Sequence, residues 1–310
     1  MIKYHTPVLL NECLNALNIK NKGIYVDTTF GGGGHSRAIL DSNPSIRLFS
    51  FDQDNDSIEN AIKLQNDFPA RFVMIQDNFA NLWTRLSLER VKKIDGILFD
   101  LGVSSHQIND SKRGFSFSYD GALDMRMDIS KELSAYEVIN KYPYEKLLSI
   151  FYKYGEEKES NRIARGIILE RQENPIKTTL ELGTIIDNYT YSRQKLKAKA
   201  RIFQALRIYV NSELESLERA LNDAIRILKP GGRIVVISYH SLEDRIVKNI
   251  FREQEKDCLC PQNFLKCVCS KQSYISVLTK KPVLPSKEEI AENSRARSAK
   301  MRFAERKDVA

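Results

Sequence analysis

The chain has 310 residues, of which 42% are hydrophobic and 28% charged, an ordinary composition for a soluble globular protein that can bury a full core and hold two domains. No apolar run approaches the roughly 20 residues that span a bilayer, and the N-terminus from Met1 to His5 lacks the apolar stretch of a signal peptide, so we expect a cytoplasmic protein. The net charge of +8 favours an anionic partner, although many basic proteins bind no nucleic acid.

The most informative stretch runs from Ile24 to Ser36, where a β-branched run ends in Asp27 and four consecutive glycines lead into a predicted helix. Glycine lets bare backbone approach a ligand because it has no Cβ. The spacing departs from the dinucleotide fingerprint G-x-G-x-x-G, and no P-loop lysine follows. Asp27 in front of the loop suits a cofactor with a cationic amino-acid end and no phosphate, such as S-adenosylmethionine. A glycine-rich turn without a ligand is the alternative.

The second predicted strand, Arg47 to Asp52, also ends in an acid. In Rossmann-like sheets a carboxylate at the tip of the second strand accepts hydrogen bonds from ribose hydroxyls, so we assign this role to Asp52, with Asp54 as a nearby competitor. The third predicted strand, Arg71 to Ile75, leads to Phe79, whose ring could flank an adenine.

The fourth predicted strand, Ile94 to Phe99, ends at Asp100, and the fifth, Arg233 to Ser238, follows a Lys-Pro-Gly-Gly turn. Helical patterns such as Ser57 to Asn66 alternate with these strands. The alternation predicts an α/β fold with a mainly parallel, Rossmann-like sheet, whose ligands bind beyond the carboxyl ends of the strands.

Well over a hundred residues separate the fourth and fifth strands, too many for one crossover helix. The region 109–211 contains several amphipathic helical patterns and few β-type runs, so we expect an inserted all-helical domain there. The patterns lie at 144–152, 162–169, 180–189 and 201–210. Residues 1–108 and 212–310 would then form the two parts of the sheet domain, the second carrying a basic tail.

Basic and aromatic side chains gather late in this insertion. The basic ones are Arg193, Lys195, Lys197, Lys199, Arg201 and Arg207, and the aromatic ones are Tyr189, Tyr191, Phe203 and Tyr209. The mixture suits phosphate contacts combined with base stacking, and a solvated helix face is the alternative.

A series of motifs in order along nearly the whole chain resembles the MraW family of small-subunit ribosomal RNA methyltransferases. The motifs are His5 to Leu10, Asp27 to Ser36, Asp95 to Ser105, Arg113 to Phe117, Leu123 to Asp128, Tyr154 to Glu156, Phe203 to Glu213, Ser238 to Arg245 and Asn293 to Ser298. The resemblance implies a class I fold with a helical insertion that uses S-adenosylmethionine to methylate N4 of a cytidine in 16S rRNA.

The resemblance also implies the site residues. The cofactor-binding positions are Gly33, Gly34, His35, Asp52, Phe79, Asp100 and Gln107. Three positions depart from the usual family pattern: Gly32, Thr28 and His106, which replaces a proline before Gln107.

Asp100 is the candidate catalytic residue. A cytosine amino group is a poor nucleophile, and its hydrogens need acceptors in the transition state. Many amino-methyltransferases place an Asp/Asn-Pro-Pro-aromatic segment after the fourth strand, but here Asp100 is followed by Leu-Gly-Val. We therefore expect the Asp100 carboxylate or nearby backbone carbonyls to accept these hydrogens. The alternative is that Asp100 only binds the cofactor.

Three further polar motifs each allow two interpretations. For His240 we favour a structural hydrogen-bond network over a general base. Asp124, Arg126 and Asp128 would share one face of a strand, where they contact RNA or stabilise a domain junction. The basic tail from Asn293 to Lys307 is either an RNA-backbone contact or a disordered end.

Four of the five cysteines, Cys258, Cys260, Cys267 and Cys269, form the pattern C-x-C-x6-C-x-C. In a reducing cytoplasm such a cluster suggests zinc more than disulfides, but C-x-C is tighter than the usual C-x2–4-C spacing, and many family members lack the cluster. The sequence leaves zinc open and assigns no metal to the reaction. Cys13 is expected in the core.

Two other classes of protein share some of these features. A nicotinamide-dependent oxidoreductase would have the same sheet, but the third glycine is missing. A non-catalytic RNA-binding protein would share the charge but has no need of a cofactor loop. The sequence leaves the modified nucleotide, the assembly state of the substrate and the oligomeric state open, a homodimer included.

Overall fold

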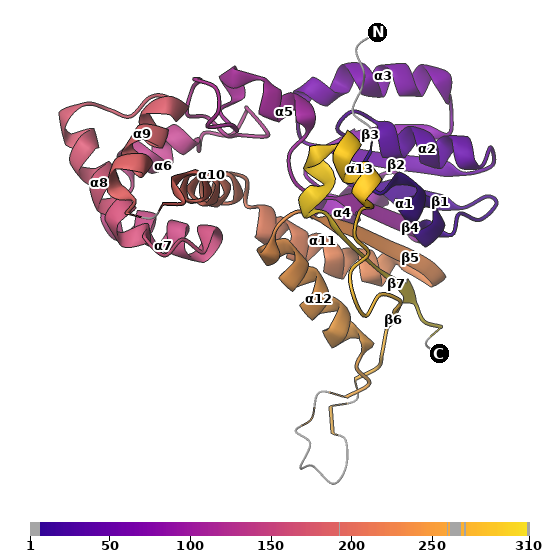
Figure 1. Cartoon of the computed structure of the whole chain (residues 1–310). Coiled ribbons are helices and arrows are strands. Elements are labelled where there is room, and N and C mark those ends of the chain that lie inside the picture. The colour runs from indigo at the N-terminus through magenta and orange to yellow at the C-terminus, as the bar shows by residue number, and fades with distance from the viewer. Residues whose placement is uncertain (1–6, 192, 259, 261–267, 270, 309–310) are drawn as a thin grey trace. The chain divides into compact units, whose positions relative to one another are not determined.

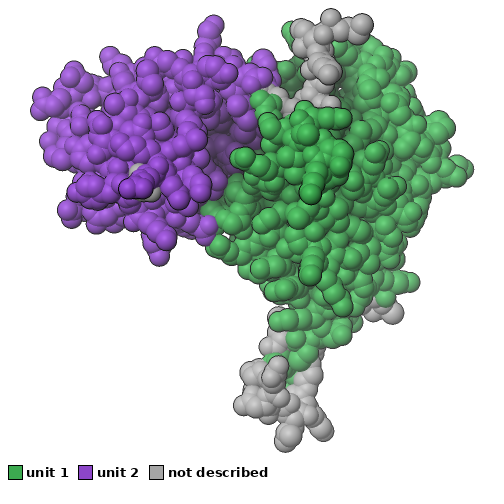
Figure 2. All heavy atoms as spheres, in the orientation of Figure 1, with its two compact units in different colours: residues 1–102, 214–310 green, residues 103–213 purple. Residues whose placement is uncertain are grey.

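The computed structural model describes residues 7–191, 193–258, 260, 268–269 and 271–308. The chain forms two compact units. The first consists of Met1–Gly102 and Leu214–Ala310, and the second of Val103–Glu213 (Figure 2). Among the described helices, none has the length and apolar character that crossing a membrane requires.

The first unit is built on a seven-stranded sheet with the order β3-β2-β1-β4-β5-β7-β6 (Figure 1). The strands are β1 Ile24–Asp27, β2 Arg47–Asp52, β3 Phe72–Gln76, β4 Ile94–Asp100, β5 Leu228–Ser238, β6 Ile275–Val277 and β7 Lys300–Arg306. β1 to β5 run parallel, whereas β7 pairs antiparallel with both β5 and β6. The five predicted strands and the mainly parallel sheet are confirmed.

The structure corrects two details of the sheet. The Lys-Pro-Gly-Gly segment predicted as a turn before the fifth strand is contained within β5, where the register against β4 shifts between Ile94 and Gly96. The basic tail is not a disordered end, because its residues Lys300–Arg306 form β7 inside the sheet. Arg302 is buried there, and its Nε donates to Asp244 Oδ1 at 2.6 Å.

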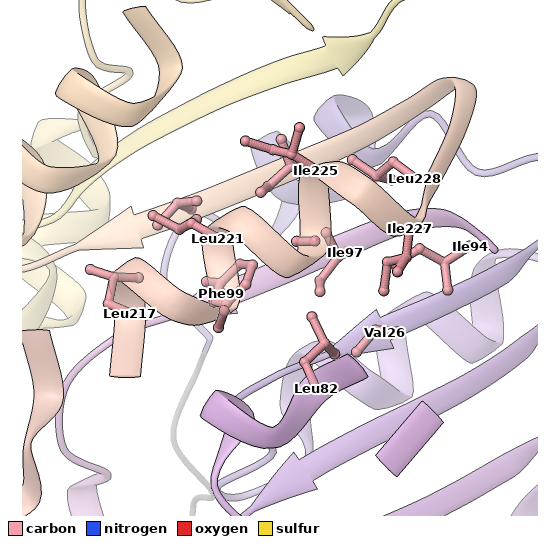
Figure 3. Packing of buried hydrophobic residues seen from close by; sticks show 14 of the residues in the cluster. Val26, Leu82, Ile94, Ile97, Phe99, Leu217, Leu221, Ile225, Ile227 and Leu228 are labelled. Atoms are coloured by element: carbon pink, nitrogen blue, oxygen red, sulfur yellow. The ribbon is translucent and has the colours of Figure 1, made fainter. Parts of the chain in front are cut away.

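Apolar side chains alternate between the two faces of the sheet and fill a core on each. In β4, Ile97 and Phe99 belong to one core and Leu98 to the other. Figure 3 shows the first core, where side chains of α11 (Glu213–Ile227) pack over Phe99 and Ile97. Burial on both faces explains why these strands are continuous apolar runs rather than alternating ones.

Helices cover both faces of the sheet. Besides α11 they are α1 Leu10–Leu17, α2 Gly34–Ser42, α3 Ile58–Asp67, α4 Leu82–Leu88, α12 Ser241–Glu255 and α13 Lys287–Glu292, with short 3-10 turns η1 Asn55–Ser57, η2 Phe79–Asn81 and η4 Ser294–Ser298. Cys13 of α1 lies in the core as expected, with its Sγ 3.6 Å from Met301 Sδ.

The second unit is helical in its described part. Its elements are α5 Ser105–Asn109, η3 Ser111–Arg113, α6 Ala135–Lys141, α7 Tyr144–Gly155, α8 Ser160–Glu173, α9 Thr179–Tyr189 and α10 Lys195–Asn211. The four helices predicted from apolar periodicity are confirmed, and each is longer than its pattern. α10 packs on α7, and α8 packs on α7 and α9.

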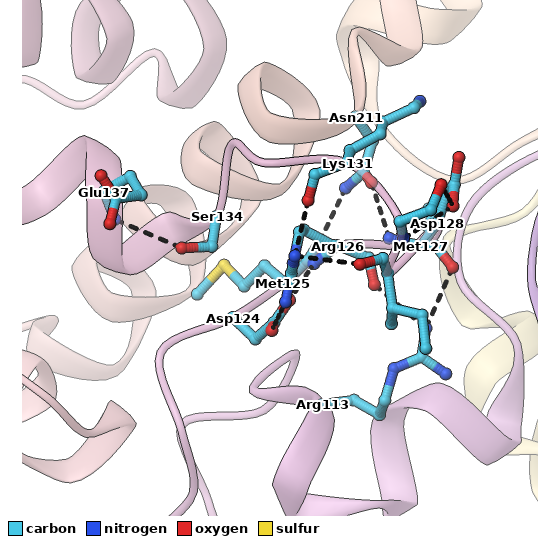
Figure 4. Close-up of polar contacts among 12 residues, drawn as sticks. Arg113, Asp124, Met125, Arg126, Met127, Asp128, Lys131, Ser134, Glu137 and Asn211 are labelled. Carbon is cyan, nitrogen blue, oxygen red and sulfur yellow. Dashed lines mark hydrogen bonds and ion pairs between the residues drawn. The ribbon is translucent and has the colours of Figure 1, made fainter.

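The segment between η3 and α6 is a loop, not the strand on which Asp124, Arg126 and Asp128 would share a face (Figure 4). Arg126 pairs with Asp124 at 2.7 Å and donates to the Ile129 carbonyl. The buried Asn211 of α10 fastens this loop, since its side chain accepts from the Met127 N–H and donates to the Met125 carbonyl, both at 2.8 Å. These contacts give the motif a structural role within the second unit.

Candidate active site

Three acids end neighbouring parallel strands at one edge of the sheet. Asp27, Asp52 and Asp100 are the last residues of β1, β2 and β4, as the sequence predicts. Carboxylates gathered in this way repel one another and resist burial, so each needs hydrogen-bond donors or a positive charge. The three acids satisfy this need differently.

Asp27 is fully buried and holds the glycine loop to helix α2. Its Oδ2 accepts from Ser36 Oγ at 2.6 Å, and its Oδ1 accepts from the Thr29 N–H at 3.1 Å. Burial raises the pKa of Asp27, while the nearby His35 and these hydrogen bonds lower it. The sequence suggested that Asp27 meets the cationic end of the cofactor. In the structure none of its surface is exposed, so it is not positioned to contact a ligand.

Asp52 is partly exposed and fastens the glycine loop to the tip of β2. Its Oδ2 accepts from the Gly31 N–H at 2.8 Å, and its Oδ1 accepts from the Asp54 N–H at 2.9 Å. Burial raises the pKa of Asp52 to about 6, against a lowering by these two N–H groups. Asp54, its competitor, is buried and caps η1 through the Asp56 N–H. Each oxygen of Asp52 keeps a lone pair for a further donor such as a hydroxyl.

The glycine loop has no room for a side chain at two of its positions, Gly33 and Gly34. Gly33 is the N-cap of α2 and adopts φ +77°, in the left-handed region that favours glycine. A Cβ on Gly33 would lie 2.8 Å from Cζ of Phe30, and one on Gly34 would clash with Pro7. Bare backbone at the start of a helix, beside a partly exposed carboxylate, fits the close approach of a nucleoside cofactor such as S-adenosylmethionine.

The buried His35 and the partly exposed Asp100 form a pair at the same edge. His35 Nε2 lies 3.1 Å from the Val8 carbonyl, which can only accept, so this nitrogen carries a proton. The opposite nitrogen, Nδ1, lies 3.4 Å from Asp100 Oδ2. Burial raises the pKa of Asp100, against a lowering by the His35 charge and by a hydrogen bond from Tyr239.

Tyr239 is a site residue that the sequence reasoning missed. Its hydroxyl donates to Asp100 Oδ1 at 2.7 Å, and burial beside this acid raises its own pKa well above the ordinary value. Tyr239 follows β5, and Ile237 of β5 is in register with Asp100 of β4. The strand order was therefore the signal that could have found it.

Phe79 and Gln107 lie in different units. Phe79 begins η2 after β3, and its ring packs edge-on against Phe99 with centroids 6.0 Å apart. Gln107 belongs to α5 of the second unit, where it is buried in a capping box: its N–H donates to Ser104 Oγ and its Oε1 accepts from the Ser104 N–H. Its contact with a cofactor stays a prediction.

His240 caps helix α12. Its Nδ1 accepts from the Glu243 N–H at 3.4 Å, while Glu243 Oε2 accepts from the N–H groups of Tyr239 and His240. This is the structural hydrogen-bond network that the sequence analysis favoured over a general base.

The sheet order, the glycine loop after β1 and the acid at the tip of β2 together define a class I methyltransferase fold. A family model described as the MraW methylase family matches residues 3–307. The chain belongs to this family. It is a methyltransferase, with S-adenosylmethionine as its cofactor.

Named relatives agree over almost the full length. A "Ribosomal RNA small subunit methyltransferase H" of Carboxydothermus hydrogenoformans is 49% identical, with 97% of each chain covered. One of Finegoldia magna is 46% identical, over 97% of this chain and 98% of that protein. Among solved structures, an rRNA methylase from Streptococcus thermophilus aligns at a TM-score of 0.42 and 10% identity, covering 99% of each chain.

Gly33→Ala should weaken cofactor binding. The new Cβ would press on the Phe30 ring, and alanine would have to adopt the left-handed backbone conformation of Gly33. We therefore expect the free energy of unfolding to fall by about 1–3 kcal/mol and the affinity for S-adenosylmethionine to be at least tenfold weaker. Thermal unfolding and isothermal titration calorimetry measure the two effects.

The matched control for this change is Gly183→Ala in the middle of α9. There the added Cβ would meet only Lys199 Cδ at 3.5 Å, an ordinary contact, and alanine favours a helix by up to about 1 kcal/mol. We expect this variant to bind the cofactor normally. Equal affinity in the two variants would show that the Gly33 loop does not contact the cofactor.

Affinity for S-adenosylmethionine should fall as the pH drops through about 6, because Asp52 takes up a proton there and loses an acceptor for the ribose. One pH unit below this pKa, the affinity should be about tenfold weaker than at pH 7.5. Titration calorimetry at both pH values measures the change.

Asp52→Asn isolates this titration from those of Asp27 and Asp100, whose pKa values are also raised. We expect the variant to bind weakly at both pH values, with little difference between them. A wild-type affinity that is the same at pH 5 and pH 7.5 would exclude Asp52 as the ribose acceptor.

Proposed function

We propose that this chain transfers a methyl group from S-adenosylmethionine to the N4 amino group of a specific cytidine in 16S rRNA. The observation that carries the proposal is the near full-length identity, 45–49%, to proteins named as small-subunit rRNA methyltransferases. The cytidine N4 atom itself comes from the family resemblance. We place the reaction in the cytoplasm on the strength of the same ribosomal RNA methyltransferase relatives.

The edge of the sheet that carries Asp52 would hold the cofactor. Gly33 and Gly34 provide bare backbone, Asp52 accepts from the ribose hydroxyls, and Phe79 lies beyond β3 as a flank for the adenine. When bound, the cofactor supplies an electrophilic methyl group. His35 and Asp100 lie beside the glycine loop, and a contact of Gln107 with the cofactor rests on the family resemblance alone.

Asp100 is the acceptor proposed for the hydrogens of the cytosine amino group. Its carboxylate is 23% exposed at the carboxyl end of β4, and Tyr239 and His35 fix one contact on each oxygen. A carboxylate held in this way keeps acceptor capacity for an amino hydrogen without having to reorganise. The alternative, that Asp100 serves only the cofactor, is supported by the same contacts.

Only some of the six basic residues between Arg193 and Arg207 are available to bind RNA. Lys199 pairs with Asp187 at 2.9 Å, Arg201 with Glu157 at 3.3 Å and Arg207 with Glu213 at 2.9 Å, so these three help hold the unit together. Arg193, Lys195 and Lys197 are exposed. We infer that these three contact phosphates.

Burial also reduces the number of aromatic residues that could stack on a base. Phe203 is 4% exposed and packs edge-on against Phe117, and Tyr209 packs between Tyr142 and Tyr154. Neither ring is presented to a base. Tyr189 is partly exposed and its hydroxyl donates to Glu170 Oε1 at 3.3 Å. Tyr191 is 82% exposed, with the Arg162 guanidinium over its ring, and is our candidate for stacking on an unpaired base.

Mass mapping of 16S rRNA tests the function. In a strain that lacks the gene, one cytidine should lose a single methyl group on N4, and expression of the wild-type chain should restore it. Expression of Asp52→Asn should restore much less. An unchanged methylation map in the deletion strain would overturn the proposal.

Lys195→Ala with Lys197→Ala should weaken binding to the small-subunit rRNA several-fold without unfolding the chain, since both lie in the first turn of α10, where positive charge is unfavourable. The slope of log affinity against log salt should become shallower by roughly one to two, for two lost phosphate contacts. Filter binding over a range of salt concentrations measures both.

The control for charge alone is Lys63→Ala with Lys92→Ala, which removes two exposed lysines of the first unit. We expect a much smaller change in affinity and slope. If both double variants behave alike, the basic residues of α10 act only through net charge.

A further inference from the structure

Three cysteine side chains converge in the connection between α12 and β6. The Sγ atoms of Cys258, Cys260 and Cys269 all lie within 4.8 Å of one another, and those of Cys258 and Cys269 are 3.7 Å apart. The fourth cysteine of the pattern, Cys267, lies outside the described residues. The cluster belongs to the first unit, in the connection that follows α12, and none of its cysteines is among the predicted cofactor-binding residues.

The separation of the sulfurs matches a metal site and not a disulfide. A disulfide brings its two sulfurs to about 2.05 Å. Four thiolates around zinc, at Zn–S distances of about 2.3 Å in a tetrahedron, place neighbouring sulfurs about 3.8 Å apart. The 3.7 Å between Cys258 and Cys269 therefore agrees with two ligands of one tetrahedral ion.

The backbone around the cluster donates to sulfur. The Cys260 N–H points to Cys258 Sγ at 3.3 Å, and the Val268 N–H to Cys260 Sγ at 3.4 Å. Donors to sulfur favour the thiolate, which is the form that binds metal. From sequence alone, the tight C-x-C spacing argued against zinc. In the structure, Cys258 and Cys260 nevertheless bring their Sγ atoms within 4.8 Å of each other, close enough to bind one ion.

Hydrophobic packing does not explain the cluster. The described residues from Lys256 to Gln272 include none that is buried, and Val268 is 72% exposed. Both ends of the connection are anchored independently: the Tyr274 N–H donates to the Gln254 carbonyl at 2.9 Å, and the Val277 N–H donates to Glu255 Oε1 at 2.8 Å. The convergence of the three thiols is therefore not a by-product of burial in an apolar core.

We propose that Cys258, Cys260 and Cys269 bind one zinc ion as thiolates in a structural site. Thiolate ligands in tetrahedral geometry select zinc over hard cations such as Mg²⁺. Binding releases the thiol protons and involves no change of oxidation state. The ion would tie Cys258 and Cys260, which follow α12, to Cys269, which precedes β6, in a connection whose described residues from Lys256 to Gln272 include none that is buried.

The test uses the full chain, purified under reducing conditions without chelator. Elemental analysis should find about one zinc per chain. Replacement with Co²⁺ under anaerobic conditions should produce a thiolate-to-cobalt charge-transfer band and the strong visible bands of a tetrahedral site. Cys258→Ser combined with Cys260→Ser should lose both the zinc and the spectrum, and Cys267→Ser tests whether that residue is the fourth ligand.

Cys13→Ala is the matched control, because it removes a thiol that lies in the apolar core beside Met301. It should keep a full equivalent of zinc. Circular dichroism and S-adenosylmethionine binding establish that the double variant is folded. The proposal is overturned if the wild type holds little zinc even after incubation with Zn²⁺, if the double variant retains zinc, or if the cysteines are found with iron or in disulfides.

Discussion

The first unit depends on how three carboxylates are accommodated at one edge of its sheet. Parallel strands end together, so Asp27, Asp52 and Asp100 are brought to the same edge, where burial raises the pKa of each. Hydroxyl and N–H donors satisfy Asp27 and Asp52, and His35 with Tyr239 satisfies Asp100. Because Ser36 and Gly31 are among these donors, the same contacts fix the glycine loop. The hydrogen bonds that satisfy the buried acids therefore also determine the shape of the cofactor-binding loop.

Much of this arrangement could be predicted from the sequence, because its signals are local. Short apolar runs that end in Asp52 and Asp100 identify both the strands and the edge at which they meet. Burial is not local. Asp27 has the same position as Asp52 in its motif, yet it is fully buried, and Ser36, nine residues later in the first turn of α2, donates a hydrogen bond to it. Tyr239 could be assigned only after β5 was placed beside β4.

Charge patterns misled more often than apolar ones. The helices of the second unit follow from their periodicity, but three of the six basic residues predicted to contact RNA pair with acids, such as Arg201 with Glu157, 44 positions away. In the same way the basic tail contains β7, whose Met301 and Ala304 alternate into the two cores of the sheet while Arg302 pairs with Asp244. A cluster of lysines and arginines shows where charge lies, whereas its partners depend on the fold.

The central claim is that the carboxyl edge of β1, β2 and β4 holds the cofactor and that Asp52 is its ribose ligand. A crystal structure of the chain with S-adenosylhomocysteine tests this most directly. The ribose hydroxyls should lie within hydrogen-bond distance of the Asp52 carboxylate, with Asp27 still bound to Ser36 and Thr29. A ribose that contacts neither Asp52 nor the Gly33 loop, or an Asp27 that turns out to the ligand, would contradict the account.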